Sequence, residues 1–310
     1  MNSEHTYNAK NEVSNIFEKR SFFQRAFITL KKAPISAWIG MIIIAFYLFV
    51  AIFAPLIAPY GEDEISKVAY AKIINPEGET KHLLGTDKIG RDIFSRLVYG
   101  ARNTIGIAVA TTMLAFLIGG SLGLLAAILR GWTDQLLSRF VDILMAIPSL
   151  IFALMLLSIF GSNVINLIFI IAVLDSTRVF RLSRAVGMNV AVMEYVEAAR
   201  LRGENLGWIM RKEILPNILP PLVAEFGLRF CYVFLMIAAL SFLGVGIQPP
   251  TADWGSMVRE SSDLIQYAQW NLFAGITPMI PAFAIAVLTI GVNFVVDWFL
   301  HLTSGLRDEK

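Results

Sequence analysis

Six apolar stretches of roughly membrane-spanning length dominate this sequence. They lie at 37–58, 104–129, 141–161, 164–179, 218–243 and 272–300, and the fourth is short. About 20 apolar residues suffice for a helix to cross the hydrocarbon core of a bilayer. Inside lipid, a spanning segment of this kind must satisfy its own backbone N–H and C=O groups, which a helix does. The chain is therefore predicted to be an all-α polytopic membrane protein with six transmembrane helices.

The composition excludes several classes of function. Of the 310 residues, 56% are hydrophobic and only 16% are charged, whereas a soluble domain carries about 25% charged residues. Cys231 is the single cysteine, and the histidines (His5, His82 and His301) are far apart in sequence. The sequence contains no Walker phosphate loop, HExxH zinc motif or GxSxG motif. We therefore expect no catalytic residues, no metal site and no ATP hydrolysis by this chain itself.

Lysine and arginine are distributed unevenly between the two sides that six spans create. Of 26 such residues, 17 fall in the segments 1–36, 130–140, 178–213 and 301–310, which share one side. Only 8 fall on the other side, and 7 of these accompany 7 acidic residues in 59–103. Because positive charge accumulates in cytoplasmic loops, both termini and the 178–213 segment are predicted to be cytoplasmic. The 59–103 segment is predicted to be folded and external.

This topology predicts five regions along the chain. Residues 1–36 form a cytoplasmic tail with an amphipathic interfacial helix, since Phe22, Phe23 and Phe27 share a face, and no signal peptide is expected. The first transmembrane helix (37–58) and the external segment (59–103) follow. A five-helix core (104–300) then contains a cytoplasmic loop at 181–217, with 130–140 as a shorter loop and Pro148 as a kink. Residues 301–310 form a cytoplasmic tail.

The polar stretch between the fourth and fifth spans is spaced like folded structure. A helical run through Glu197, Ala198 and Ala199 meets Gly203, which is suited to the left-handed conformation that ends helices. Asn205 is a plausible N-cap of a second short helix. Prolines 216, 220 and 221 are predicted to end that helix and start the next span. The stretch is therefore interpreted as a helix–turn–helix at the membrane face.

The spacing of this stretch resembles the cytoplasmic "EAA" loop of binding-protein-dependent ABC importer permeases. The matching residues are Glu197, Ala198, Ala199, Gly203, Ile214, Leu215 and Pro216. Their position between the fourth and fifth of six spans strengthens the resemblance. Two departures stand out: Lys212-Glu213 replaces a basic residue and histidine, and the family's C-terminal Gly-Asp pattern reads Val296-Asp297.

Further motifs are similar to the C-type subunit of the dipeptide, oligopeptide and nickel class, most like the dipeptide type. They include HLLGTD at 82–87, GRD at 90–92, YGAR at 99–102 and FLGVG at 242–246. The resemblance implies the type I ABC importer permease fold. It also suggests an external docking or gate element formed by Gly85, Thr86, Asp87, Gly90, Arg91, Asp92 and Arg96. The alternative, a folded loop that only stabilises its own side, is equally open.

The resemblance implies a subunit that moves dipeptides or short peptides across the bacterial cytoplasmic membrane with ATP hydrolysed by partners. Those partners are a B-type permease in a heterodimer, two ATPase subunits that bind ATP and Mg²⁺, and an extracytoplasmic peptide-binding protein. The chain itself would bind no cofactor and no nucleic acid, and would contact membrane lipid. The EAA-like residues would couple the ATPases to the spans.

Other interpretations stay open at this point. An ion-coupled secondary transporter would also be polytopic, and a membrane-embedded enzyme is a further class. Related ABC permeases act on nickel chelates, glutathione or peptide antibiotics. Charged residues within spans are functional candidates, but Glu225 and Arg229 stand at i, i+4 and are expected to pair. Asp175 is expected to pair with Arg178 or Arg181, and the aromatic residues Trp254, Tyr267 and Trp270 to form an interfacial belt.

Overall fold

The chain folds almost entirely into helices in a computed structural model that describes residues 33–66, 69–70, 82–269 and 271–303. The long helices are α3 (Ile35–Ile52), α5 (Ile93–Leu129), α6 (Gly131–Ala146), α7 (Ser149–Phe160), α8 (Val164–Val190), α11 (Leu215–Phe242) and α14 (Met279–Thr303). Shorter ones are α4 (Ala54–Ile57), α9 (Glu194–Leu201), α10 (Leu206–Trp208), the π-helical turn η1 (Ile209–Ile214), α12 (Trp254–Ser261), the 3₁₀ turn η2 (Ser262–Tyr267) and α13 (Leu272–Ile276). The predicted interfacial helix near residues 22–30 and the tail after 303 lie outside the described residues.

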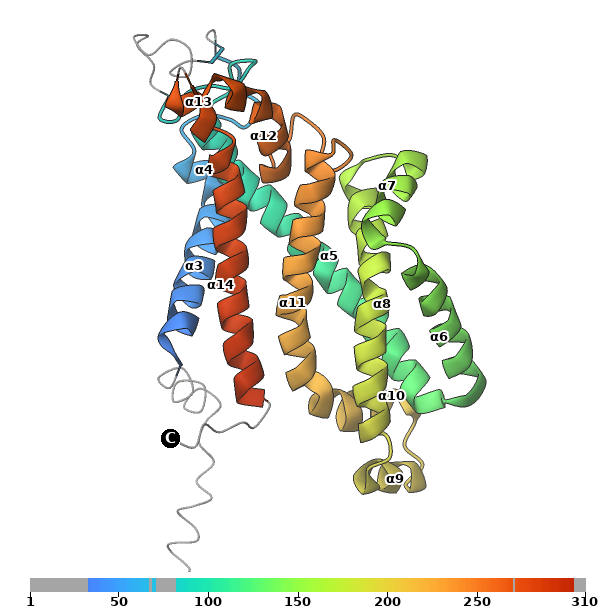
Figure 1. The fold of residues 1–310 in the computed structure, drawn as a ribbon. Helices are drawn as coiled ribbons and strands as arrows, with labels where there is room; N and C mark the ends of the chain where they lie inside the picture. Colours follow the sequence, from blue (N-terminus) through green and yellow to red (C-terminus); the bar gives the residue numbers. More distant parts are fainter. Residues whose placement is uncertain (1–32, 67–68, 71–81, 270, 304–310) are drawn as a thin grey trace, which may run out of the picture.

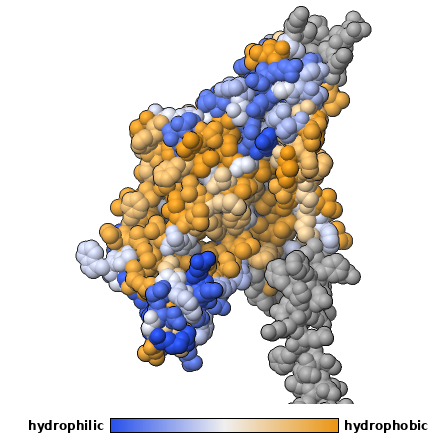
Figure 2. Space-filling view, turned by 180° about the vertical axis from the view of Figure 1, so that it is seen from behind, coloured by the Kyte–Doolittle hydropathy of each residue, from blue (hydrophilic) through white to orange (hydrophobic). Residues whose placement is uncertain are grey.

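The helices form a bundle with two polar ends. In Figure 1, α9 lies at one end of the bundle, and α12 and α13 lie at the other. The beginning of α3 and the end of α14 lie at the same end as α9. Figure 2 shows a broad apolar band between polar surfaces at the two ends. This distribution is that of a protein whose middle is surrounded by lipid.

Four helical segments are long and apolar enough to cross a membrane: Ile35–Ile52, Ile93–Leu129, Leu206–Phe242 and Leu272–Leu302. A fifth span results if α6 and α7 are counted together, although the two are bent by 89°. Helix α8 has 27 residues, or about 40 Å, but Asp175, Arg178 and Arg181 interrupt its apolar character. The predicted total of six spans requires that α8 also crosses the membrane, and it stays a prediction.

One continuous helix crosses the predicted boundary between the 59–103 segment and the core, and that boundary stays a prediction. Helix α5 begins at Ile93 and continues without a break to Leu129. Its N-cap is Asp92, whose carboxylate accepts a 2.7 Å hydrogen bond from the Ser95 backbone N–H. Arg96 lies in the first turns of this helix, and its buried guanidinium is paired with Glu260.

Two predicted loops are largely helical. Residues 130–140 lie mostly in α6, and only Arg130 and Gly131, both with positive φ, form the turn from α5. Pro148 does more than kink a helix: α6 ends at Ala146 and α7 starts at Ser149. Helix α8 continues to Val190, so the arginines at 178, 181 and 184 lie on one uninterrupted helix. The 181–217 bounds of the polar loop stay a prediction.

The prolines after the loop do not end a helix as predicted. Pro216 lies in the first turn of α11, where no backbone N–H is needed, and Pro220 and Pro221 lie inside the same helix. The π-helical turn η1 leads directly into α11. The predicted span at 272–300 agrees with the apolar segment Leu272–Leu302, which consists of the short helix α13 and the long helix α14 from Met279.

Glycines allow α5 and α8 to pack with their backbones in contact. A Cβ atom on Gly123 would lie 2.6 Å from the Phe180 carbonyl oxygen, and one on Gly119 would collide with the Ser176 carbonyl oxygen. Similarly, α3 packs on α14 where a Cβ on Gly40 would lie 2.5 Å from the Gly291 oxygen. Small residues at helix contacts are typical of membrane bundles. The α5–α8 contact fixes the helix that leads into the polar α9 end.

Adding one methyl group at Gly119 should destabilise the bundle. We expect Gly119→Ala to lower the free energy of unfolding by about 1–3 kcal/mol, because the Ser176 carbonyl must move away. Unfolding in detergent micelles measures this change. The matched control is Gly106→Ala in the same helix, where no atom lies within 4 Å of the added Cβ. Equal stability of the two variants would contradict the close-packing argument.

Candidate functional site

The segment 191–214 folds as two short helices around a glycine turn. Helix α9 ends at Leu201, and Gly203 follows with φ of +80°. The Gly203 N–H donates to the Arg200 carbonyl at 2.9 Å, and the Glu204 N–H donates to the Ala199 carbonyl at 3.2 Å. No atom would meet a Cβ on Gly203, so its backbone conformation alone favours glycine. The predicted glycine stop is confirmed.

Asn205 caps the next turn, as predicted. Its side-chain oxygen accepts a 2.8 Å hydrogen bond from the Trp208 N–H. The chain then passes through η1 into α11. At the edge of this turn, Glu213 lies 3.8 Å from Arg202 and joins the two ends of the loop. Glu213, which stands where the family pattern has histidine, therefore has a charged partner within the loop.

One face of this segment is buried in the protein itself. Val196 and Ala199 of α9 are fully buried, together with Ile209 and Ile214 of η1. They belong to an apolar cluster that includes Leu124, Ile128, Ile218 and Leu222 from α5 and α11. The prediction that both alanines bring α9 close to a partner is thus wrong for Ala199. Ala199 brings α9 close to its own bundle.

The opposite face of α9 is exposed. Glu197 and Ala198 of the EAA-like motif are exposed, and so is Gly203. Of the remaining motif residues, Leu215 is half-buried and Pro216 is exposed. Several large apolar side chains are also exposed around the turn: Val192, Met193, Tyr195, Leu201 and Leu206. An apolar patch with charged neighbours at a polar end is typical of a protein-binding surface.

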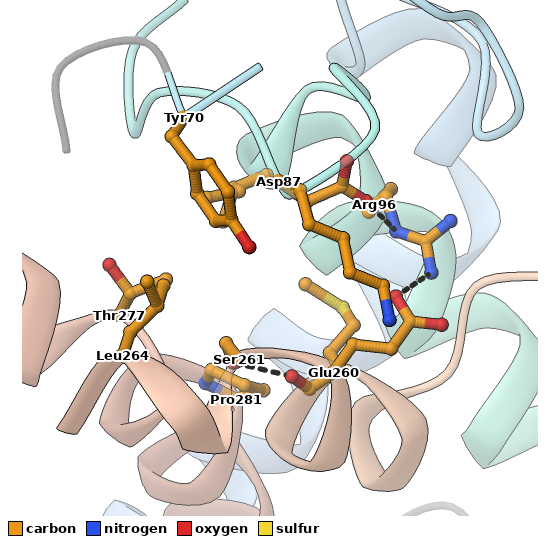
Figure 3. A pocket seen from close by; sticks show the side chains of 11 residues that line it. Tyr70, Asp87, Arg96, Glu260, Ser261, Leu264, Thr277 and Pro281 are labelled. Carbon is orange, nitrogen blue, oxygen red and sulfur yellow. Dashed lines mark hydrogen bonds and ion pairs between the residues drawn. The ribbon is translucent and has the colours of Figure 1, made fainter. Parts of the chain in front are cut away.

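Charged residues of the 85–96 motif instead form a buried ionic network. The Arg91 guanidinium donates to Asp87 Oδ2 and to Glu260 Oε2, both at 2.6 Å. Arg96 donates to Glu260 Oε2 at 3.3 Å, and its Nε lies 3.9 Å from Asp87 Oδ2. Glu260 belongs to α12, so the network joins two segments far apart in sequence. Figure 3 shows Asp87, Arg96 and Glu260 converging beside one pocket.

The other members of this motif shape the turn before α5. Gly85 and Gly90 have φ of +82° and +92°, and a Cβ on Gly90 would lie 2.5 Å from the Ser66 carbonyl oxygen. Thr86 is fully buried. Asp92 accepts from the Ser95 N–H and lies 2.9 Å from His82 Nδ1. The seven predicted residues are therefore brought together, but as internal structure rather than as an exposed docking face.

Tyr70 faces the same pocket from the other side (Figure 3). Burial, and then the neighbouring charges of Asp87 and Asp263, raise the pKa of its phenol above the ordinary value. Tyr70 is therefore neutral at physiological pH and can donate a hydrogen bond.

Trp254 does not belong to the predicted aromatic belt of 244–271. Trp254 is only 1% exposed, and its Nε1–H donates to the Leu97 carbonyl at 2.9 Å. A Cβ on Gly100 would lie 2.8 Å from the Trp254 ring, so this glycine makes room for the indole. Tyr267 is exposed, and Trp270 lies outside the described residues.

The charged residues inside the bundle are paired. Arg229 Nε lies 2.7 Å from Glu225 Oε1, which confirms the predicted pair. Asp175 Oδ1 lies 3.3 Å from Arg178 and 3.5 Å from Arg229. Arg181 does not pair with Asp175; its side chain donates to Asp142 at 2.7 Å. Two helices, α8 and α11, are thus joined by charge.

Sequence reasoning missed the long-range partners. Glu260 and Asp134 carry no motif signal, yet Glu260 holds Arg91 and Arg96, and Asp134 holds Arg184 through a 2.7 Å hydrogen bond. The spacing of arginines at 178, 181 and 184 on one helical face was the available signal that α8 needs acidic partners. Among the described residues, no group of three or more His, Cys, Asp and Glu side chains could hold a metal ion.

Comparison with known proteins agrees with this arrangement. Residues 119–304 match the family described as binding-protein-dependent transport system inner membrane component. Residues 21–72 match the N-terminal transmembrane domain of oligopeptide transport permease C. The chain therefore belongs to the binding-protein-dependent transport system inner membrane components, the permease subunits of ABC importers.

Individual relatives cover nearly the whole chain. The dipeptide transport system permease protein DppC of Alkalihalophilus pseudofirmus is 36% identical over 92% of this chain and 88% of its own length. The di/tripeptide permease DppC of Pseudomonas aeruginosa is 35% identical (83% and 86%), and the glutathione transport system permease GsiD of Pectobacterium atrosepticum is 31% identical (92% and 88%). Among solved structures, the inward-facing MetNI methionine ABC transporter matches with 18% identity and a TM-score of 0.49, covering 67% of this chain and 97% of that one.

Removing the Glu260 carboxylate should destabilise the end of the protein that carries α12. We expect Glu260→Gln to lower the free energy of unfolding by about 3 kcal/mol, because two buried guanidinium groups lose their shared partner. The thermal midpoint in detergent and the proteolysis rate of the 82–92 segment both report this loss. Asp63→Asn, which neutralises an exposed carboxylate on the same segment, is the control and should change neither. A Glu260→Gln variant as stable as Asp63→Asn would contradict the network's structural role.

Proposed function

We propose that this chain is the C-type permease subunit of an ATP-driven importer of dipeptides or other short peptides in a bacterial cytoplasmic membrane. It would form a heterodimer with a B-type permease, bind two cytoplasmic ATPase subunits, and receive cargo from an extracytoplasmic binding protein. The names of the three relatives support the peptide class, since these proteins are permeases for dipeptides, di- and tripeptides, and glutathione.

The observation that carries the proposal is the two-sided construction of the 191–214 segment. Its buried face, with Val196, Ala199 and Ile214, fixes it to α5 and α11. Its other face exposes Glu197 and Ala198 at the end of the molecule. A partner that pushed on the exposed face would therefore displace the helices attached to the buried face. This is the coupling role that we assign to Glu197, Ala198, Ala199, Gly203, Ile214, Leu215 and Pro216.

In this mechanism the ATPases bind ATP and Mg²⁺, and this chain supplies no catalytic group. Closure of the ATPase dimer would move α9, and the bundle would change between inward-open and outward-open states. Glu197 would pair with a basic group of the ATPase, and Ala198 would allow close approach of the two backbones. The exposed apolar residues beside them, such as Leu201 at 84% exposure, would be covered by the ATPase.

The external end would receive the binding protein. The network of Asp87, Arg91, Arg96 and Glu260 gives that end a rigid surface, with Leu83 and Ile89 exposed on the same turn. Both termini and α9 would be cytoplasmic, as the excess of lysine and arginine favours. The seven external motif residues would then act by holding the docking surface rather than by touching the binding protein.

Transport by the reconstituted complex tests the proposed function. The permease pair, both ATPases and the binding protein are placed in liposomes with ATP on the cytoplasmic side, and uptake of labelled dipeptide, glutathione and a nickel chelate is measured. We expect ATP-dependent uptake of a short peptide that requires the binding protein. Uptake that needs an ion gradient but no ATP would overturn the proposal in favour of a secondary transporter.

Reversing the charge of Glu197 should uncouple the partners. We expect Glu197→Lys to lower peptide uptake at least tenfold and to weaken ATPase association, because two basic groups would then face each other at the contact. Co-purification and uptake report the two effects. Glu204→Lys makes the same charge change in the adjacent turn, outside α9, and should retain most of the activity. If Glu197→Lys transports as well as Glu204→Lys, the coupling role of this face is wrong.

A further inference from the structure

A cluster of four charged side chains lies between α8 and α11; two of them are buried, one is half-buried and Arg178 is exposed. Asp175 and Arg178 come from α8, and Glu225 and Arg229 come from α11. Asp175 is 4% exposed and Arg229 is 9% exposed. The cluster has no net charge, since it contains two acidic and two basic groups.

Its position relative to the α9 loop is symmetrical. Helix α8 leads into the loop and α11 leads out of it, so the two helices run in opposite directions (Figure 1). Asp175 lies 15 residues before the end of α8, and Arg229 lies 14 residues after the start of α11. At 1.5 Å per residue, both are about 20 Å from the loop. Asp175 and Arg229 are thus at about the same distance from the α9 loop along their helices.

Each charged group has one partner on its own helix, and one contact crosses between the helices. Arg178 pairs with Asp175 within α8 at 3.3 Å, and Glu225 pairs with Arg229 within α11 at 2.7 Å. The Asp175–Arg229 ion pair, at 3.5 Å, joins α8 to α11. The other two ion pairs described for this cluster each lie within one helix. The pairs within each helix already neutralise the charges, so neutralisation alone does not require the crossing contact.

Stability explains this arrangement poorly. Within the described part of the chain, Asp175 Oδ2 and the Nε and Nη1 atoms of Arg229 are buried without a properly aligned hydrogen bond. A partly satisfied ionic network is less favourable than apolar packing of the same volume. Arg229 is further held against the Tyr232 ring, with its Cζ atom 4.6 Å from the ring centre. The position of the guanidinium is therefore restricted by its neighbours, although its hydrogen-bonding capacity is not fully used.

We propose that the Asp175–Arg229 ion pair is a brace that makes α8 and α11 move as one body when the α9 loop is displaced. The inference rests on the proposed function, because it assumes that the loop is pushed by an ATPase. Near the loop, α8 and α11 share an apolar cluster, to which α8 contributes Leu182 and Val186 and α11 contributes Ile218 and Leu222. Farther away, the ion pair would transmit the displacement to the outer half of both helices. Asp175 and Arg229 are thus positioning residues for transport.

The coupling ratio, peptide molecules imported per ATP hydrolysed, tests the brace in the reconstituted complex. We expect Asp175→Asn and Arg229→Gln to lower this ratio at least about threefold while the complex still assembles and hydrolyses ATP. The controls remove equal charges from the same cluster but keep the crossing pair: Glu225→Gln for the acid and Arg178→Gln for the base. Both controls should retain the wild-type ratio. Equal losses in all four variants would show that only charge balance matters and would overturn the brace.

A distance measurement gives a second readout that does not depend on activity. Spin labels on Phe169→Cys and Leu235→Cys, with Cys231→Ala, report the separation of α8 and α11 six residues beyond the ion pair; both positions are exposed. In the otherwise wild-type complex we expect one distance that is the same with and without ATP, and a broadened distribution in Asp175→Asn. A wild-type distance that changes with nucleotide would refute the brace. Failure of the unmodified complex to import peptide with ATP would instead refute the proposed function.

Discussion

Helix α8 must carry charge through an apolar bundle, and its neighbours are arranged around that requirement. Arg184 and Arg181 reach Asp134 and Asp142 of α6, and Asp175 reaches Arg229 of α11. An unpaired charge within an apolar bundle is strongly unfavourable, and α6 and α11 supply partners for these charged side chains of α8. On its remaining side, α8 packs against the glycines of α5. The polar segment after α8 is therefore attached to a helix that contacts α5, α6, α7 and α11 directly.

The two polar ends of the molecule use charge in different ways. At the α12 end, arginines and carboxylates are buried and hold α5 to α12. At the α9 end, most charged side chains are exposed, and apolar contacts such as those of Val196 and Ile214 hold the segment in place. The charged groups of one end are thus paired with each other inside the protein. The other end exposes charged groups with which a partner protein can form ion pairs. This difference is what an importer needs if one end is pushed and the other holds its shape.

Local features were predictable from the sequence, whereas contacts between distant segments were not. Gly203, Asn205 and the Glu225–Arg229 pair depend on neighbours within a few residues, and all three were predicted correctly. The break at Pro148 was placed correctly but its 89° bend was not, because packing decides the size of a bend. The partner of Arg91 is 169 residues away, and no local pattern indicates Glu260. Local turns and pairs within one helix could therefore be predicted, whereas the partners of Arg91 and Arg96 depend on the tertiary fold.

The proposed coupling requires that the exposed face of α9, and not its buried face, meets the ATPase. Cysteine crosslinking of the assembled complex tests this requirement, because the one natural cysteine, Cys231, is buried. Ala198→Cys should crosslink to an ATPase subunit, whereas Ala199→Cys, one residue farther but fully buried, should not. Crosslinking through Ala199→Cys, or none through Ala198→Cys in a complex that hydrolyses ATP, would contradict the coupling role of the exposed face.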